Sequence, residues 1–131
     1  MAGPASEAVD LIPETAIVSL DAYRAAGGGA GLAEAHRLGP AAIIDVIARS
    51  GLRGRGGGGF PTGRKWSGIA AQTGLRRYLV VNGAEGEPGT FKDRALLRAN
   101  PYQVVEGMII AAAAVGAEAV FVGVKGSFQR E

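Results

Sequence analysis

Two short apolar runs, separated by a long helical stretch, most restrict the folds open to this 131-residue chain. The first run, Tyr78 to Val81, is followed by the turn pair Asn82-Gly83, and the second is Ala119 to Val124. Runs of this kind are typical of strands buried in a parallel sheet. Because strand, long helical crossover and strand make a β-α-β unit, we expect an α/β fold with a Rossmann-like parallel sheet.

Several helices are expected around this unit. Residues 1–18 are predicted to be a flexible leader, and residues 19–131 one domain region that begins with helices at 19–26, 32–38 and 40–50. Residues 66–72 are predicted to form a short helix or turn. Thr90 with Asp93 marks the start of one crossover helix, and Asn100 the start of a second, which Gly116 ends.

The stretch GLRGRGGGGFPTGRKW, residues 51–66, is the most unusual part of the chain. Glycine is costly to order, so such a bare backbone indicates that something lies against the main chain. Gly54 to Gly59 match G-x-G-x-x-G, but the motif follows a helix where the dinucleotide fingerprint needs a strand, and a Walker A loop fails because Arg64 stands where Lys is needed. An arginine-glycine RNA-binding tract and a plain linker are the alternatives, although Phe60 and Trp66 argue against a linker.

Charge favours a phosphate ligand at this stretch. From Val46 to Ala84 there are seven basic residues and no acidic one. Main-chain N–H groups and cations both stabilise phosphate, and Lys65 is the preferred contact, whereas Arg76 and Arg77 are interpreted as a solvated basic face. The net charge of the whole chain is only +2, so nucleic acid is not an indicated partner.

The turn NGAEGEPG, residues 82–89, leaves the carboxyl end of the first strand, where α/β sheets usually bind ligands. The glycine stretch and this turn are therefore expected to face each other across one site. Glu85 and Glu87 are two apart, so in an extended segment both would point to the same side. Hydrogen bonding to a sugar or a flavin edge is preferred over a metal site, and a polar surface turn is the plain alternative.

Two segments together resemble a known family. SGLRGRGGGGFPTGRKW and YLVVNGAEGEPGTFKDR, in this order and spacing, resemble the flavin-binding, NADH-oxidising subunit of respiratory complex I and its relatives in NAD-dependent hydrogenases and formate dehydrogenases. The likeness extends over roughly residues 20–127. It implies that FMN and NADH bind here, that NADH passes a hydride to the flavin, and that electrons leave through an iron-sulfur cluster.

The resemblance also implies site residues. Gly54, Arg55, Gly56 and Gly57 would lie close to FMN and the nucleotide. Phe60 would stack near the NADH adenine, and Lys65 would contact the cofactors. Asn82 and Glu85 would line the flavin, and Glu87 the nicotinamide-ribose side. No residue is expected to be catalytic, because the flavin carries the chemistry, and no metal ligand is expected.

The chain departs from the family pattern at three positions. Ala84 stands where the family usually has Asp, Gly58 where it commonly has Ala, and Gly68 where it has an aromatic residue. There is no cysteine, so the iron-sulfur cluster is expected outside this chain. The chain also ends at Glu131, before the remaining sheet expected of the family, which indicates an incomplete FMN-binding domain.

The predicted function is the flavin- and NADH-binding part of an NADH:quinone-type oxidoreductase, with NADH and other subunits of an electron-transfer complex as partners. The alternative is a non-catalytic remnant or assembly module that does not bind FMN stably. No secretory signal is recognised, and the apolar stretch Gly107 to Ala117 is well short of the roughly 20 residues that span a bilayer. We therefore expect a cytoplasmic chain, peripheral to a membrane complex, with no direct membrane insertion.

Overall fold

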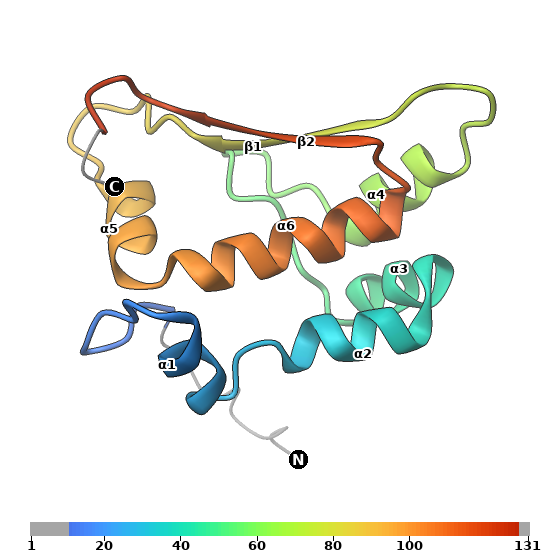
Figure 1. Cartoon of the computed structure of the whole chain (residues 1–131). Helices are drawn as coiled ribbons and strands as arrows, with labels where there is room; N and C mark the ends of the chain where they lie inside the picture. The colour runs from blue at the N-terminus through green and yellow to red at the C-terminus, as the bar shows by residue number, and fades with distance from the viewer. Residues whose placement is uncertain (1–10, 129–131) are drawn as a thin grey trace, which may run out of the picture.

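The computed structural model describes residues 11–128, which form six helices and two strands (Figure 1). The three helices predicted before the sheet and the two predicted crossover helices are all present. The segment predicted at 66–72 is a helix that begins earlier, at Thr62. In chain order the elements are α1 (Leu20–Ala25), α2 (Ala30–Leu38), α3 (Pro40–Arg49), α4 (Thr62–Ala70), β1 (Tyr78–Gly83), α5 (Lys92–Ala99), α6 (Pro101–Val115) and β2 (Ala119–Val124).

The two strands pair in parallel, as predicted. Tyr78 lies opposite Ala119, and Gly83 lies opposite Val124. Helices α5 and α6 connect the strands, and α6 runs along one face of the sheet (Figure 1). This is a β-α-β unit, so the prediction of an α/β fold is confirmed.

Helix α6 forms the middle layer of the molecule, between the sheet and the pair α2 and α3 (Figure 1). A buried cluster joins the three helices through Ala35, Ile43, Ile44 and Ala114. Burial of one isoleucine side chain contributes roughly 1.5–3 kcal/mol, so this cluster is a main source of stability. Partly buried side chains pack around it, including two from α4: Leu38, Ile47, Trp66, Ala70 and Ile110.

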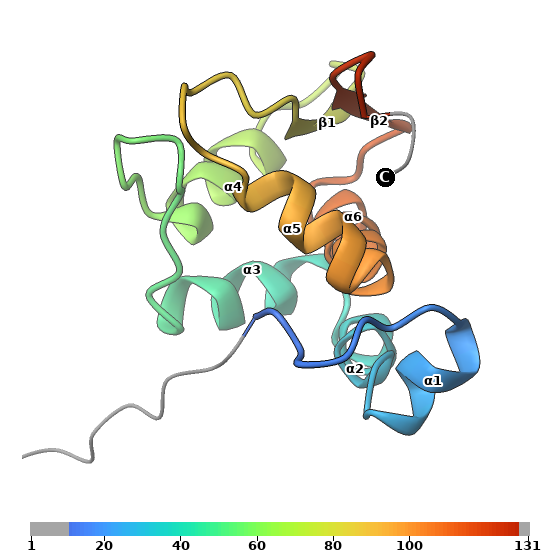
Figure 2. The ribbon, with the colours of Figure 1, turned by 90° about the vertical axis from the view of Figure 1, so that its left-hand side faces the viewer.

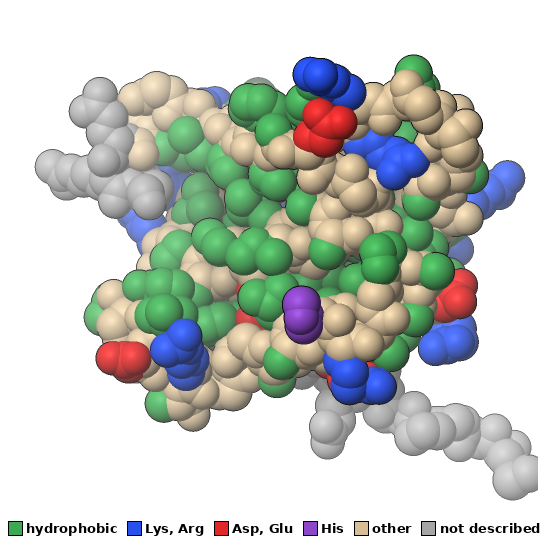
Figure 3. Space-filling model, turned by 45° about the vertical axis from the view of Figure 1, so that its right-hand side comes forward, with side chains coloured by type: hydrophobic (Ala, Val, Ile, Leu, Met, Phe, Trp, Pro, Cys, Tyr) green, Lys and Arg blue, Asp and Glu red, His purple; other side chains and the backbone are tan. Residues whose placement is uncertain are grey.

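The expectation that both strands are buried is wrong. Tyr78, Val80 and Phe121 on the outer face are 54%, 68% and 56% exposed, because within residues 11–128 the helices cover only the face toward α6. Most of β2 is exposed on both faces. Hydrophobic side chains accordingly reach the surface over much of the view in Figure 3.

The helix starts predicted at Ser19 and Asn100 are confirmed, whereas the start predicted at Thr90 differs in its chemistry and in its capping residue, which is Phe91. Ser19 Oγ accepts a hydrogen bond from Ala22 N at 3.1 Å, and Asn100 Oδ1 accepts one from Gln103 N at 3.2 Å. Thr90 does not cap α5, since its hydroxyl donates to the Glu87 carbonyl instead. The first turn of α5 is capped by a glutamate from the preceding loop, described below.

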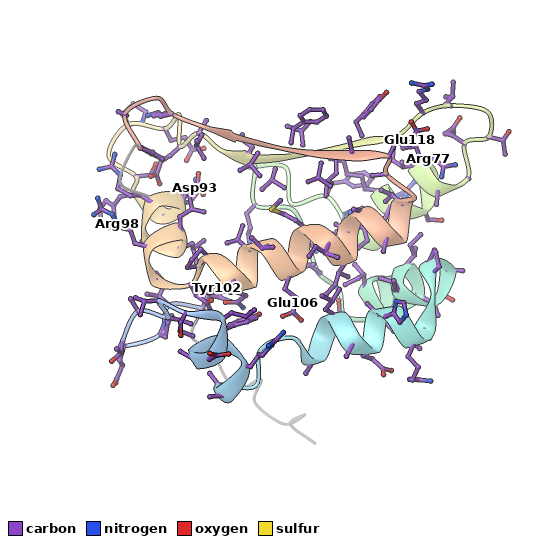
Figure 4. All side chains as sticks on the ribbon, viewed as in Figure 1. Arg77, Asp93, Arg98, Tyr102, Glu106 and Glu118 are labelled. Carbon is purple, nitrogen blue, oxygen red and sulfur yellow. The ribbon has the colours of Figure 1, made fainter. Side chains whose placement is uncertain are left out.

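A carboxylate on α6 fastens this helix to the start of α2. Glu106 accepts hydrogen bonds from the Tyr23 hydroxyl at 2.5 Å and from the backbone N–H groups of Gly29 and Leu32 at 2.7 and 2.8 Å (Figure 4). Burial acts to raise the pKa of Glu106, but these hydrogen bonds outweigh it and hold the pKa below its usual range. Burial and the bond to Glu106 raise the pKa of Tyr23 to about 12.

Arg77 is not part of a solvated basic face, contrary to the prediction. Its guanidinium donates to the carbonyl groups of Val115 at 3.1 Å and Ala70 at 3.3 Å, and also to that of Gln72 (Figure 4). These carbonyls lie at or just beyond the last turns of α4 and α6, whose carbonyl groups have no partner within their own helices. Arg77 therefore ties the ends of these two helices together just before β1 begins.

The leader predicted at 1–18 lies partly outside the described residues, which begin at residue 11. Residues 11–19 form neither helix nor strand, and the Ile17 N–H donates to the Ala99 carbonyl at 2.8 Å. None of the helices within residues 11–128 is long and apolar enough to cross a membrane.

Candidate functional site

The glycine stretch forms a closed loop between α3 and α4. Arg53 and Pro61 make an antiparallel bridge at its base, Gly54 N donates to the Phe60 carbonyl at 2.9 Å, and the Arg53 guanidinium donates to the Gly59 carbonyl at 3.0 Å. Gly57 has a φ of 93°, a conformation that favours glycine. A plain linker would have none of these bonds, so the loop has a defined shape.

Close packing of α3 against α4 fixes both arms of this loop. A Cβ atom on Gly63 would lie 2.5 Å from the Ala48 Cα and 2.6 Å from the Ala48 N. Only glycine permits such an approach to another backbone. Further out, at Gly56 and Gly58, a Cβ atom would meet no atom of residues 11–128 within 4 Å, so the outer part of the loop has a bare backbone with open space beside it.

The loop after β1 holds a buried carboxylate. Glu85 is only 4% exposed, and its Oε1 accepts a hydrogen bond from Asp93 N in the first turn of α5 at 3.1 Å. Its Oε2 is buried and has no hydrogen-bond partner among residues 11–128. A buried carboxylate oxygen without a partner is costly, so this atom is a candidate contact for a ligand.

The backbone of this loop is not extended. The expectation that Glu85 and Glu87 point to the same side required an extended segment, and it therefore does not apply. Glu85 has a φ of 42°, which is uncommon for a residue with a side chain. The Asn82 side chain stabilises the turn by accepting a hydrogen bond from Ala84 N at 3.0 Å. Glu85 is buried, whereas Glu87 is exposed.

The two loops face each other across a cavity of about 470 Å³, as the sequence predicted. Figure 2 shows the glycine loop and the loop after β1 on the same side of the molecule. Five of the predicted site residues line this cavity, from both loops. The full lining is Arg55, Gly56, Asn82, Glu85, Gly86, Glu87, Lys92 and Asp93.

A neighbouring hollow of about 390 Å³ contains three other predicted residues, Gly54, Phe60 and Lys65. It lies between the base of the glycine loop, α4 and β1, and its lining includes the aromatic residues Trp66 and Tyr78. The Phe60 ring is half exposed, and the Arg64 guanidinium lies 5.8 Å from its centre. The predicted set is thus divided between two hollows, and Gly57 lines neither of them.

Lys92 and Asp93 line the first cavity but were not predicted as site residues. The Lys92 Nζ lies 3.2 Å from the Asp93 Oδ2. The helix start recognised at Thr90 and Asp93 was the available signal, because it brings the first turn of α5 to the carboxyl end of β1.

A third cavity, of about 480 Å³, lies between α3, α4 and the end of α6 and contains none of the predicted residues. Its wall is mainly apolar, and the Arg77 guanidinium in it already bonds to backbone carbonyls. We therefore place the candidate site between the two loops. Within residues 11–128, no group of three or more His, Cys, Asp or Glu side chains is arranged to hold a metal ion.

Fold and site together define a class of protein: an α/β ligand-binding fold in which a glycine loop faces the carboxyl end of a parallel strand. The family model described as the Nuo51 FMN-binding domain matches residues 47–131, and the chain belongs to this family. The matched region includes the glycine loop, both strands and the loop that contains Glu85. The resemblance noted in the sequence is therefore confirmed.

Curated relatives agree with this assignment. An NADH-quinone oxidoreductase subunit of Rhizobium meliloti (strain 1021) is 46% identical over 110 residues, which cover 83% of this chain and 26% of the relative. An NADH-quinone oxidoreductase subunit of Aquifex aeolicus (strain VF5) is 44% identical over 110 residues, 84% of this chain and 26% of the relative. The chain thus spans about a quarter of the length of these relatives.

A solved structure supports the same fold. The NAD⁺-reducing [NiFe]-hydrogenase in its H₂-reduced state superimposes with a TM-score of 0.63 and 48% identity. The match covers 67% of this chain and 15% of the hydrogenase chain. The fold is therefore that of part of an FMN-binding domain.

Proposed function

We propose that this chain forms one side of the FMN- and NADH-binding site of an NADH-oxidising flavoprotein. The observation that carries the proposal is the cavity between the two loops, which is lined by Glu85, whose buried Oε2 has no hydrogen-bond partner within residues 11–128. The FMN-binding family supports FMN as one cofactor, and the names of the curated relatives support the proposal of NADH as the other.

The cavity fits part of a phosphorylated, hydroxyl-bearing ligand such as FMN. Its volume of about 470 Å³ is within the range of roughly 300–1,000 Å³ that small-molecule sites occupy. Glu85 requires a hydrogen-bond donor, which a ribityl hydroxyl or a flavin N–H can provide. Asn82 and Glu87 offer further polar groups, while Arg55 and the bare backbone at Gly56 favour phosphate.

The second hollow suits the nucleotide part of NADH. Phe60 is half exposed, so part of its ring is accessible for stacking on an adenine base, and Lys65 in the same hollow supplies a positive charge. Trp66 and Tyr78 add aromatic surface. Gly54, at the base of the glycine loop, lines this second hollow, and its neighbour Arg55 lines the first cavity. A bound dinucleotide would therefore follow the glycine loop from one hollow to the other.

When bound, FMN would accept a hydride from NADH and pass electrons on one at a time. The residues of this chain have the roles of binding and orienting the two cofactors. Other subunits of an electron-transfer complex are the proposed partners, with the iron-sulfur cluster outside this chain. The corresponding location is the cytoplasm, peripheral to a membrane complex.

Flavin titration tests this function. The purified chain is expected to quench the fluorescence of added FMN, and a complete site would lose its visible absorbance when NADH is added. Glu85→Gln keeps an oxygen for the Asp93 N–H but presents an amide where an acceptor is needed, so FMN affinity should fall about tenfold.

Glu118→Gln is the matched control, since Glu118 is an exposed carboxylate just before β2, at the opposite end of the sheet (Figure 4). It should bind FMN as the parent does. Failure of the parent to bind FMN would overturn flavin binding by this chain and favour the alternative of a non-catalytic assembly module. Binding without bleaching by NADH would leave a flavin-binding module that is not a dehydrogenase.

A further inference from the structure

We infer that Lys92, at the start of α5, is a contact for a ligand phosphate in the cavity between the two loops. This inference rests on the proposed function and deepens it, because it places the phosphate of the bound cofactor. The chemistry concerned is a phosphate ester or anhydride group on a ligand that also carries hydroxyl or N–H donors.

The division of the site into two hollows leads to this assignment. Lys65, the cation first expected at the phosphate, lies in the aromatic hollow with Phe60. The basic residues that line the cavity with Glu85 are Arg55 and Lys92. A phosphate bound in this cavity must therefore take its positive partners from the outer part of the glycine loop and from the first residue of α5.

The cavity lining has both signs of charge, which restricts the ligand. Glu85, Glu87 and Asp93 contribute carboxylates that accept hydrogen bonds and repel a plain anion. A phosphorylated polyol satisfies both kinds of group, since its hydroxyls face the carboxylates and its phosphate faces the cations. Inorganic anions alone would gain less from this arrangement.

Lys92 is available for such a contact. Among residues 11–128 its one ion pair is with the adjacent Asp93, at 3.2 Å, and its side chain is half exposed. Ion pairs of exposed side chains are weak, whereas a phosphate with near-double charge forms stronger bonds to an ammonium group. A phosphate can therefore compete with Asp93 for the Lys92 Nζ.

The position of Lys92 is held by the same carboxylate that marks the site. Asp93 N, next in the chain, donates to Glu85 Oε1 at 3.1 Å, so the start of α5 is joined to the loop that lines the cavity. Glu85, which lines the cavity, thus keeps the Lys92 backbone beside it, and its other oxygen is buried without a hydrogen-bond partner among residues 11–128. The cation and the buried acceptor are parts of one small structural unit.

Paired ligands that differ in phosphate test the inference with the complete 131-residue chain. FMN is compared with riboflavin, and ADP-ribose with adenosine, so the two arms distinguish a flavin phosphate from a nucleotide phosphate. Lys92→Gln should lose about three- to tenfold affinity for the phosphorylated member of one pair and leave the unphosphorylated member unchanged. Lys92→Arg, which keeps the charge, should restore most of the loss.

Arg76→Ala is the matched control for net charge, because Arg76 is exposed and pairs loosely with Glu118 at 3.8 Å. This variant should leave the affinity for both members of each ligand pair unchanged. Equal losses for both members of a pair, or no loss in either arm, would overturn the role of Lys92 while leaving cofactor binding intact. If the parent binds neither flavin nor nucleotide, the proposed function fails and the inference fails with it.

Discussion

The packing of α3 against α4 predicts opposite effects for two glycine-to-alanine changes on the same helix. Gly63→Ala would place a Cβ atom 2.5 Å from the Ala48 Cα, about 0.9 Å short of the ordinary 3.4 Å. Because the atoms it meets include backbone, which cannot rotate aside, α4 has to move away from α3. In Gly68→Ala the added Cβ atom meets no other atom within 4 Å in the described part of the chain.

The two costs can be estimated separately. Overpacking of this kind destabilises by about 1–3 kcal/mol, and the better helix propensity of alanine returns at most roughly 1 kcal/mol at Gly63. We expect Gly63→Ala to lower the free energy of unfolding by about 1–2 kcal/mol. Gly68→Ala has only the propensity gain and should raise the free energy of unfolding by roughly 0.5–1 kcal/mol.

Urea unfolding followed by fluorescence measures both, because Trp66 is the only tryptophan and lies on α4 between the two sites. Since Gly63 sets the spacing of the helices that carry the glycine loop, Gly63→Ala should also weaken FMN binding. Equal stability changes in the two variants, or a stabilised Gly63→Ala, would refute the claim that this close approach positions the loop.

Two further changes test the contacts that join the layers. Glu106→Gln should lower the free energy of unfolding by about 1–3 kcal/mol near pH 7, because an amide cannot accept all three hydrogen bonds. Since the folded pKa of Glu106 is lowered, its contribution is present above the unfolded value of about 4.3 and lost as pH falls through the folded value. Between pH 6 and pH 3 the free energy of unfolding should therefore fall less steeply in Glu106→Gln than in the parent. Identical slopes of this free energy against pH would contradict the prediction. Arg77→Ala should cost about 2 kcal/mol in urea unfolding, whereas Arg76→Ala should stay within about 0.5 kcal/mol, and similar values would show that Arg77 is not a tie between helix ends.

Local signals in the sequence were sufficient for most of the fold. Ser19 and Asn100 cap helices where expected, and Gly116, with a φ of 65°, ends α6. These features depend on neighbours within a few residues, and so the sequence displays them directly. The parallel pairing of the strands followed from the length of the crossover between them.

Contacts between distant residues were not readable in the same way. The Tyr23 hydroxyl and Glu106 are 83 positions apart, and no local pattern marks their hydrogen bond. Arg77 was assigned with Arg76 to a solvated basic face, although its partners are carbonyls at the ends of two helices. Burial of the strands was overestimated, since apolar composition alone does not reveal how many faces of a sheet are covered.

The candidate site likewise has features that follow from local sequence and features that depend on tertiary packing. By itself the sequence determined that a glycine loop and the turn after β1 would meet, because carboxyl ends of parallel strands and glycine-rich backbones have fixed chemical uses. Tertiary structure decided which side chains share a cavity. It separated Lys65 from Glu85, brought in Lys92, and buried the Glu85 carboxylate with one oxygen on α5 and the other without a partner among residues 11–128. The reason is physical: residue type and spacing set local conformation, whereas burial and hydrogen-bond partners depend on how separate elements pack.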